Sequence, residues 1–135
     1  MSAKRPNIAA NMLWCVPGSV GGSEEYFVRQ MLGLSEIDAP FNVTIYAPLG
    51  FSAAHSELAS AMQVVEAPSR CTSREFRVLL ENTWLAKRAG SADFVHHGGG
   101  TIPSRGNPST LLTIHDVQYL TCLLYTSPSP RDLST

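Results

Sequence analysis

A glycine-rich stretch near the start of the chain has the composition of an anion-binding loop. PGSVGG ends with Gly21 and Gly22 and is followed by Ser23, Glu24 and Glu25, which are typical of the first turn of a helix. Glycines let backbone N–H groups approach a phosphate closely, and the helix dipole favours negative charge there. The spacing matches neither GxGxxG nor a P-loop, so no nicotinamide cofactor is predicted. A plain tight turn is the alternative to an anion site.

Histidines occur in two further stretches whose residue types are compatible with ligand binding. DFVHHGGG contains His96 and His97, and TIHD ends with His115 and Asp116. At a strand end, a neutral imidazole can hydrogen-bond a substrate, and an aspartate can bind a hydroxyl group. A satisfied core or surface histidine is the alternative in each case, and His55 is assigned no role. No metal is predicted, because the spacing does not match a zinc-binding helix and no fourth histidine or cysteine completes a compact site.

Alternating strands and helices are predicted to bring these stretches together. The hydrophobic pattern predicts strands over 7–16, 41–47, 62–66, 93–96 and 110–115, and helices over 23–34, 52–61 and 74–89. On the last helix, the side chains predicted to face the core are Phe76, Leu79, Leu80, Thr83, Trp84 and Leu85. This alternation is typical of an α/β fold with an open, parallel, Rossmann-like sheet, in which ligands bind beyond the carboxyl ends of the strands. All three stretches would open on that edge.

Composition restricts the class of protein. The 135 residues carry a formal net charge of −1 and are 44% hydrophobic, which is enough for one domain with a core. This balance gives no electrostatic reason to expect a nucleic acid partner. The apolar runs are too short to span a membrane, and the N-terminus resembles a strand more than a signal peptide, so a cytoplasmic protein is predicted. Cys15, Cys71 and Cys122 show no metal-like spacing and are expected to be reduced thiols.

The last residues of the chain have a different character from the rest. CLLYTSPSPRD, from Cys122 to Asp132, matches the translation of a common transposase-based sequencing adaptor residue for residue. Residues 122–135 are therefore not expected to belong to the fold, and residues 1–121 are expected to be an incomplete N-terminal domain of a longer protein. A disordered tail rich in serine and proline is the alternative.

Taken in order, VPGSVGGSEEY, DFVHHGGGTIP and LLTIHDVQYL resemble the N-terminal half of bacterial glycosyltransferase family 4 enzymes, and the resemblance covers essentially residues 7–121. It implies the acceptor-side half of a two-domain GT-B fold. It also implies transfer of a sugar from a nucleotide-diphosphate sugar to an acceptor, with retention of the anomeric configuration and without a catalytic metal or a cofactor.

The resemblance further implies roles for individual residues. The backbone at Gly21 and Gly22 would face the donor diphosphate, and His115 would contact the donor sugar and stabilise the transition state. The acceptor side would be lined by Glu25, Tyr26, His97, Gly98, Gly99, Gly100 and Asp116. The acceptor would be a carbohydrate or a glycolipid. Peripheral membrane association is common in the family, although no basic amphipathic helix stands out in this sequence.

Most of the nucleotide-sugar site of that family lies in a C-terminal half that has no counterpart in these 135 residues. The chain by itself is therefore predicted to be inactive, because the leaving phosphate needs hydrogen-bond donors on both sides. Another nucleotide-sugar enzyme of the same architecture, such as a retaining sugar synthase or an epimerase-like relative, is one alternative. A non-catalytic Rossmann-like domain that binds a phosphorylated ligand is the other.

Overall fold

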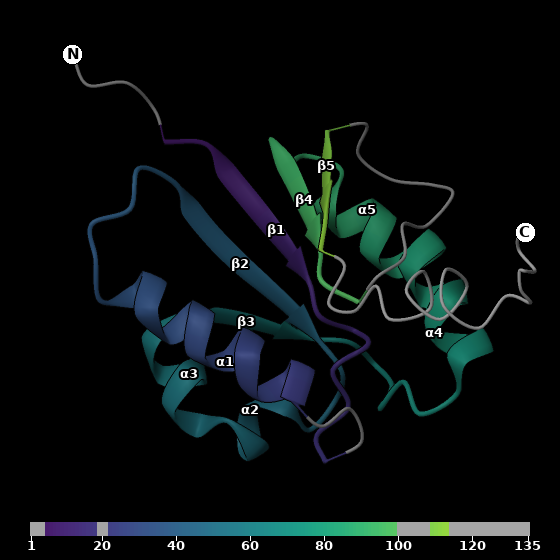
Figure 1. The fold of residues 1–135 in the computed structure, drawn as a ribbon. Coiled ribbons are helices and arrows are strands. Elements are labelled where there is room, and N and C mark those ends of the chain that lie inside the picture. Colours follow the sequence, from purple (N-terminus) through teal and green to yellow (C-terminus); the bar gives the residue numbers. More distant parts are fainter. Residues whose placement is uncertain (1–4, 19–21, 100–108, 114–135) are drawn as a thin grey trace, which may run out of the picture.

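The computed structural model describes residues 5–18, 22–99 and 109–113, which form an open sheet with helices on both faces (Figure 1). The strands are β1 (Asn7–Asn11), β2 (Asn42–Ala47), β3 (Gln63–Glu66), β4 (Phe94–His97) and β5 (Thr110–Leu112), and all pairs are parallel. Their spatial order is β3-β2-β1-β4-β5. The predicted fold class, an α/β fold with an open, Rossmann-like parallel sheet, is confirmed.

Helices cover the sheet from two sides (Figure 1). Between β1 and β3, the chain forms α1 (Gly22–Ser35), α2 (Phe51–Ala54) and α3 (Ser56–Ala61) on one face. Between β3 and β4, it forms α4 (Arg74–Leu80), the π-helical turn η1 (Glu81–Leu85) and α5 (Ala86–Ala89) on the other face. Right-handed crossovers produce this arrangement when the direction of travel across the sheet reverses between β3 and β4.

Two hydrophobic clusters hold these layers together. Alternate residues of β1 point to opposite faces of the sheet, as in any strand. Ala10 belongs to the cluster that contains Phe27 and Met31 of α1, whereas Ala9 belongs to the cluster that contains Leu85 of η1. Because both faces of the strand are buried, the segment is apolar on both sides, as is typical of parallel sheets.

The predicted element types agree with the structure, and the largest difference in boundaries follows β1. The strand predicted over 7–16 ends at Asn11, although Met12 and Cys15 beyond it are still buried. These residues form a turn, in which the Cys15 N–H group donates to the Met12 carbonyl oxygen at 2.9 Å. A buried turn and a buried strand have the same apolar composition, so the pattern does not separate them. The strand predicted over 110–115 ends at Leu112, and His115 lies outside the described residues.

The predicted core face of the helix over 74–89 is partly wrong. Leu80 and Leu85 are buried as expected, but Phe76, Leu79 and Thr83 are exposed. No side chain of α4 before Leu80 is buried, so the first turns of this helix extend beyond the core. The π turn η1 then adds a residue to the helical repeat, which rotates the positions before it relative to those after it. A regular helical period cannot anticipate this shift.

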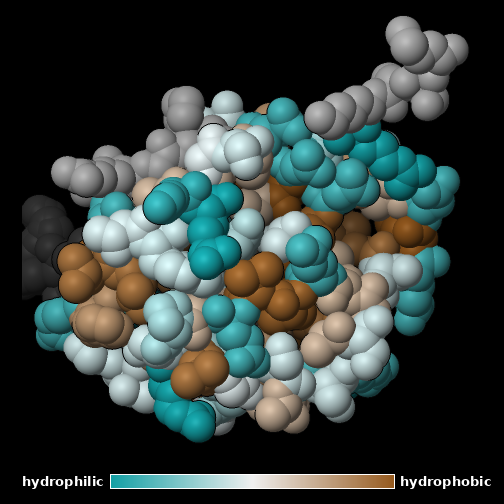
Figure 2. Space-filling model, turned by 180° about the vertical axis from the view of Figure 1, so that it is seen from behind, coloured by the Kyte–Doolittle hydropathy of each residue, from teal (hydrophilic) through white to brown (hydrophobic). Residues whose placement is uncertain are grey.

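Large apolar side chains are exposed on several elements: Tyr26, Ile37, Leu49, Phe76, Val78, Leu79, Phe94 and Leu111. Figure 2 shows that hydrophobic residues on the rear face are divided by hydrophilic ones into separate areas. None of the helices in the described ranges is both long and apolar enough to cross a membrane.

Candidate functional site

The site is centred on the two strands where the chain order of the sheet reverses. β1 and β4 are parallel neighbours, although the chain passes through β2 and β3 between them. Their following loops meet at the carboxyl edge, where the Gly98 N–H group donates to the Asn11 carbonyl oxygen at 3.4 Å. Ligands of open α/β sheets bind in the crevice at such a switch point. PGSVGG and HHGGG therefore start from the edge at which this fold class places its ligands.

Gly22 is the first residue of α1 and borders open space. A Cβ atom at this position would have no heavy atom of the described residues within 4 Å. The backbone N–H groups of the first turn lack partners within the helix, so an anion at this end has donors and room. Gly33 of the same helix is equally unobstructed, so open space alone does not mark a site. Gly21 lies outside the described residues.

The first turn of α1 is acidic, and both of its carboxylates have partners. Glu24 accepts a hydrogen bond from the Gly18 N–H group at 3.0 Å and pairs with Nε2 of His55. Glu25 pairs with Arg29, one turn later at the surface. An anion that arrives at α1 would meet these carboxylates together with the helix dipole, and the pairing partners reduce the repulsion. His55, which has no predicted role, lies between α2 and α3 and contacts the first turn of α1 through Glu24.

Cys15 lies in the same loop and is fully buried. Burial raises the pKa of its thiol to about 12, and the Glu24 carboxylate nearby adds to this shift. The nucleophilic thiolate is therefore scarce at neutral pH, which argues against a catalytic role for this cysteine. Cys15 and Cys71 are both free thiols, as expected.

Gly98 and Gly99 lie against aromatic rings just after β4. A Cβ atom at Gly98 would lie 2.8 Å from the Phe27 ring, and one at Gly99 would lie 2.6 Å from the Trp14 ring. Both contacts are too short for a side chain unless the ring moves. The two rings are themselves in edge contact, with centroids 5.3 Å apart. Close packing is thus one reason for these glycines, beside the acceptor-side role that the resemblance implies.

Three buried polar side chains form a hydrogen-bonded network between the sheet and η1. Nδ2 of Asn11 lies 2.9 Å from Oε2 of Glu81 and 2.9 Å from Nδ1 of His97. Asn11 is 1% exposed, and Glu81 and His97 are each 3% exposed. A buried polar group without a partner destabilises a fold by about 1–3 kcal/mol, so this mutual bonding offsets the cost of burial. The network lies at the carboxyl ends of β1 and β4, where the ligand is expected.

The neighbouring histidines of β4 point to opposite faces of the sheet. His97 faces η1, and burial together with nearby His96 lowers its pKa, so its ring is neutral at neutral pH. His96 faces α1: its Nε2 atom lies 2.6 Å from Oγ1 of Thr113, and its ring centroid lies 5.6 Å from that of Phe27. β4 therefore has one histidine on each face of the sheet. The buried His97 ring is hydrogen-bonded to Asn11.

The structure brings together a part of the predicted site. Gly22 and His97 with its two following glycines lie near the β1/β4 edge, while Glu25 and Tyr26 are exposed on the first turns of α1. The remaining predicted residues lie outside the described part of the chain: Gly21, Gly100, His115 and Asp116. The tail over 122–135 also lies outside it. The histidine expected to contact the donor sugar is therefore not placed.

Asn11 and Glu81 lie beside the candidate site, and no motif in the sequence marks them. A signal for each is present, because Asn11 interrupts an apolar run and Glu81 follows Leu80 within another. A polar residue inside a buried segment needs a partner, which makes such positions worth tracing. The two residues are 70 positions apart in the chain, and only the fold shows that they are paired.

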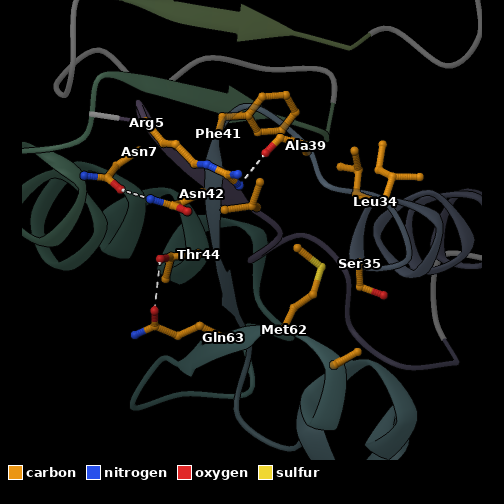
Figure 3. A pocket seen from close by; sticks show the side chains of 13 residues that line it. Arg5, Asn7, Leu34, Ser35, Ala39, Phe41, Asn42, Thr44, Met62 and Gln63 are labelled. Carbon is orange, nitrogen blue, oxygen red and sulfur yellow. Dashed lines mark hydrogen bonds between the residues drawn. The ribbon is translucent and has the colours of Figure 1, made fainter. Parts of the chain in front are cut away.

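A hollow of about 480 Å³ lies at the opposite edge of the sheet, at the amino ends of β2 and β3. Figure 3 shows hydrogen bonds between polar groups of its lining, including one from Arg5 to the Ala39 carbonyl oxygen. Nδ2 of Asn42 donates to Oδ1 of Asn7 at 3.3 Å, and Oγ1 of Thr44 donates to Oε1 of Gln63 at 3.4 Å. None of the predicted site residues lines this hollow.

A second hollow, of about 460 Å³, lies between α1 and the sheet on the α1 face. Its lining is mainly apolar and includes Met31, Phe94 and Leu111. His96 is the one histidine among its lining residues. This hollow therefore offers apolar contact area beside the candidate site and little polar chemistry of its own.

Comparison with known proteins adds no family assignment. Among the described residues, no group of three or more His, Cys, Asp or Glu side chains is arranged to hold a metal ion. No protein-family model matches the chain, and neither a curated protein nor a solved structure is significantly similar to it. What is shown is an α/β domain with a five-stranded, all-parallel sheet.

Proposed function

We propose that this chain supplies the acceptor-side half of a retaining glycosyltransferase that uses a nucleotide-diphosphate sugar. The observation that carries the proposal is the switch point between β1 and β4. The strand order is independent of the sequence stretches on which the family resemblance rests. It supports the proposal because PGSVGG and the glycines of HHGGG follow β1 and β4 in the chain, and this fold class binds ligands at the edge where those strands end.

In the proposed reaction, an oxygen of an acceptor hydroxyl forms a bond to the anomeric carbon of the donor sugar. The bond from that carbon to the donor diphosphate breaks, the diphosphate leaves with the electron pair, and the hydroxyl proton passes to it or to water. Negative charge thus grows on the leaving phosphate, and the N–H groups of the first turn of α1 would stabilise it. The open space at Gly22 leaves room for that approach.

The described residues of this edge offer backbone N–H groups and the imidazoles of His97 and His55, the latter paired with Glu24. Arg70 lies beside Gly50 and Glu66 at the ends of β2 and β3. Within the described ranges, Nε of Arg77 is buried without a hydrogen-bond partner. Arg29 is paired with Glu25, and Arg5 lies at the opposite end of the sheet. We propose that strong donor binding also uses basic groups outside the described residues, because a diphosphate is bound most strongly by charge-assisted hydrogen bonds.

A non-catalytic domain that binds a phosphorylated ligand is the second candidate. It is favoured by a specific observation: Gly98 and Gly99 are explained by close contact with the Phe27 and Trp14 rings, without any acceptor. Under this alternative only the N-terminus of α1 would bind a ligand, and no acceptor-dependent chemistry would follow.

Sugar transfer by the product of the complete source reading frame tests the proposal. A DNA read through the codons for residues 121–135 would first establish that frame. The purified protein would then be incubated with UDP-, GDP-, ADP- and dTDP-hexoses, and release of the nucleoside diphosphate would be measured with and without carbohydrate acceptors. We expect acceptor-dependent release with at least one donor, and retention of the anomeric configuration by NMR. Binding of nucleoside diphosphates without release from any donor would favour the second candidate.

A further inference from the structure

Asn11 determines which nitrogen of His97 carries the proton. The Leu13 N–H group, which can only donate, lies 3.2 Å from Oδ1 of Asn11, and together with the Glu81 carboxylate on the other side it fixes the orientation of the amide. The amide nitrogen therefore faces Oε2 of Glu81 and Nδ1 of His97, each at 2.9 Å. An amide nitrogen donates and does not accept, so Nδ1 of His97 must be the acceptor. In the neutral ring, the proton is then on Nε2.

The Nε2–H group of His97 has no hydrogen-bond acceptor within residues 5–18, 22–99 and 109–113. His97 as a whole is 3% exposed, but the one fully buried side-chain nitrogen or oxygen without a partner in the described ranges is Nε of Arg77, not Nε2 of His97. A donor that its own protein leaves unpaired is available to a ligand. This donor lies at the β1/β4 switch point, where ligands of this fold class bind, so an atom of a ligand is the acceptor to consider.

We propose that Asn11 and Glu81 are positioning residues that hold His97 as a neutral Nε2–H donor to a hydroxyl oxygen of an uncharged ligand group. In this role, His97 gives a hydrogen bond and does not take up a proton as a general base. The protonation pattern rests on the network alone. The choice of a carbohydrate hydroxyl as the partner rests on the proposed function.

Glu81 makes this position unfavourable for an anionic ligand group. Its carboxylate is 3% exposed and, within the described ranges, has no cationic partner within 4.0 Å. It is bonded to Asn11, which is bonded in turn to His97. In a poorly solvated environment a carboxylate repels a second negative charge strongly, whereas a neutral hydroxyl meets no such repulsion. Phosphate is therefore assigned to the α1 end of the crevice and hydroxyl groups to the His97 end.

The position of Glu81 depends on the π turn. Glu81 is the first residue of η1, and the two residues after it bond back to the preceding turn: Nδ2 of Asn82 to the Val78 carbonyl oxygen, and Oγ1 of Thr83 to the Leu79 carbonyl oxygen. Such turns interrupt the helical register and frequently occur at functional sites. Here the interruption coincides with the one buried carboxylate in the described part of the chain.

Nitrogen-15 NMR of the histidine side chains in the full 135-residue chain measures the protonation pattern directly. A ring nitrogen with a lone pair resonates far from one that carries a proton, and loss of a signal in His97→Gln assigns the ring. We expect Nδ1 of His97 to be unprotonated and Nε2 to be protonated at neutral pH. Asn11→Asp is expected to move a proton onto Nδ1, because a carboxylate only accepts. Asn42→Asp, the same change at an exposed position, is expected to leave His97 unaltered.

A protonated Nδ1 in the unmodified chain would overturn the proposal, whether or not Asn11→Asp folds. Glu81→Gln retains an oxygen that can accept from Asn11, so it is expected to preserve the protonation pattern. Glu81→Leu removes that acceptor and is expected to leave a mixture of tautomers. If Glu81→Leu left a single unchanged tautomer, Glu81 would not be a positioning residue.

Two probes test the ligand class in the same spectra: methyl glycosides of glucose, mannose and galactose, and inorganic phosphate. We expect at least one glycoside to shift the Nε2–H signal of His97, and phosphate to shift the backbone signal of Gly22 without moving that of His97. A response of His97 to phosphate alone, or to neither probe, would show that the assigned ligand class is wrong. A chain that shows the expected tautomer and glycoside response, while the complete protein transfers no sugar, would contradict only the proposed function.

Discussion

The two ends of the sheet use polar side chains in opposite ways. At the amino ends, around the hollow in Figure 3, exposed polar groups pair with one another, as Asn42 does with Asn7. At the carboxyl ends of β1 and β4, the polar groups are buried, and the network that starts at Glu81 ends in a His97 donor without an acceptor in the described ranges. The amino-end hollow is large, about 480 Å³, yet its polar groups already have partners. A donor that lacks a partner is thus the better mark of a ligand site than volume.

The largest effect on stability is expected from removing Asn11. Asn11→Leu leaves the buried Glu81 carboxylate and Nδ1 of His97 without their shared partner. The free energy of unfolding should fall by about 3 kcal/mol, because a buried charge loses its hydrogen bond. Asn42→Leu, at the exposed amino end, should change it by less than about 0.5 kcal/mol. Urea denaturation of both variants measures the difference, and equal losses would mean that the two ends do not differ in this way.

The next largest effect is expected at the glycines after β4. Gly99→Ala brings a methyl group to within 2.6 Å of the Trp14 ring, so either the ring or the loop must move. Such overpacking destabilises by about 1–3 kcal/mol. Gly33→Ala, in unobstructed space within α1, should instead stabilise the fold by about 0.5–1 kcal/mol. Thermal unfolding of the pair provides the measurement, and a stabilising Gly99→Ala would contradict the close contact.

A smaller effect is expected from pH, through His97. Burial and nearby His96 lower the pKa of His97 from its ordinary value of 6.5, and Glu81 is the carboxylate that faces the same network. As the pH falls below 6.5, the unfolded chain therefore binds a proton that the folded chain does not, and stability decreases. One such group contributes at most about 1.4 kcal/mol per pH unit.

Denaturation between about pH 7.5 and 5.5 tests this dependence. His97→Gln should give a flatter stability profile than the unmodified chain, and identical slopes would show that His97 titrates normally in the fold.

Glu66 contributes to the pH dependence of stability in a more acidic range. Hydrogen bonds from the Ser52 and Gly50 N–H groups lower the pKa of its carboxyl group. Its stabilising contribution is present above its ordinary value of 4.5 and is lost only below it.

The smallest effect is expected at the amino end. Arg5 pairs with Asp38 at 2.7 Å, and their side chains are 47% and 86% exposed. Exposed ion pairs contribute about 0–1 kcal/mol, so Arg5→Ala should barely change the free energy of unfolding and should not alter ligand binding. A loss of nucleotide or glycoside binding in Arg5→Ala would move the candidate site to the hollow at the amino end.

The sequence predicts the fold better than it predicts the site, for physical reasons. Periodicity and turn residues act locally, so the alternating strands and helices follow from the sequence, as does the burial of Leu80 and Leu85. Strand order and the pairing of Asn11 with Glu81 depend on contacts far apart in the chain, which no local pattern contains. The π turn that exposes Leu79 is likewise a tertiary feature, because the sequence around it keeps a regular helical pattern.

The glycines also show that a local sequence pattern does not reveal tertiary contacts. The resemblance implies ligand approach for Gly21, Gly22 and Gly98 to Gly100, with a plain turn as the alternative at the first loop. Those of them that the structure describes differ in what surrounds them. Gly22 borders open space, but Gly98 and Gly99 are packed against aromatic rings. The sequence alone does not distinguish a glycine that leaves room for a ligand from one that is packed against a neighbouring side chain.

Calorimetry with UDP, GDP and ADP would measure whether the carboxyl edge at α1 binds the diphosphate of a sugar nucleotide, as we propose. The titrations would compare the unmodified chain, Gly22→Leu and Gly33→Leu, since both glycines have open surroundings on the same helix. The account predicts that at least one nucleotide binds, that Gly22→Leu weakens this binding about tenfold or more, and that Gly33→Leu does not. Equal affinities for all three proteins, or no binding to any of them, would contradict it.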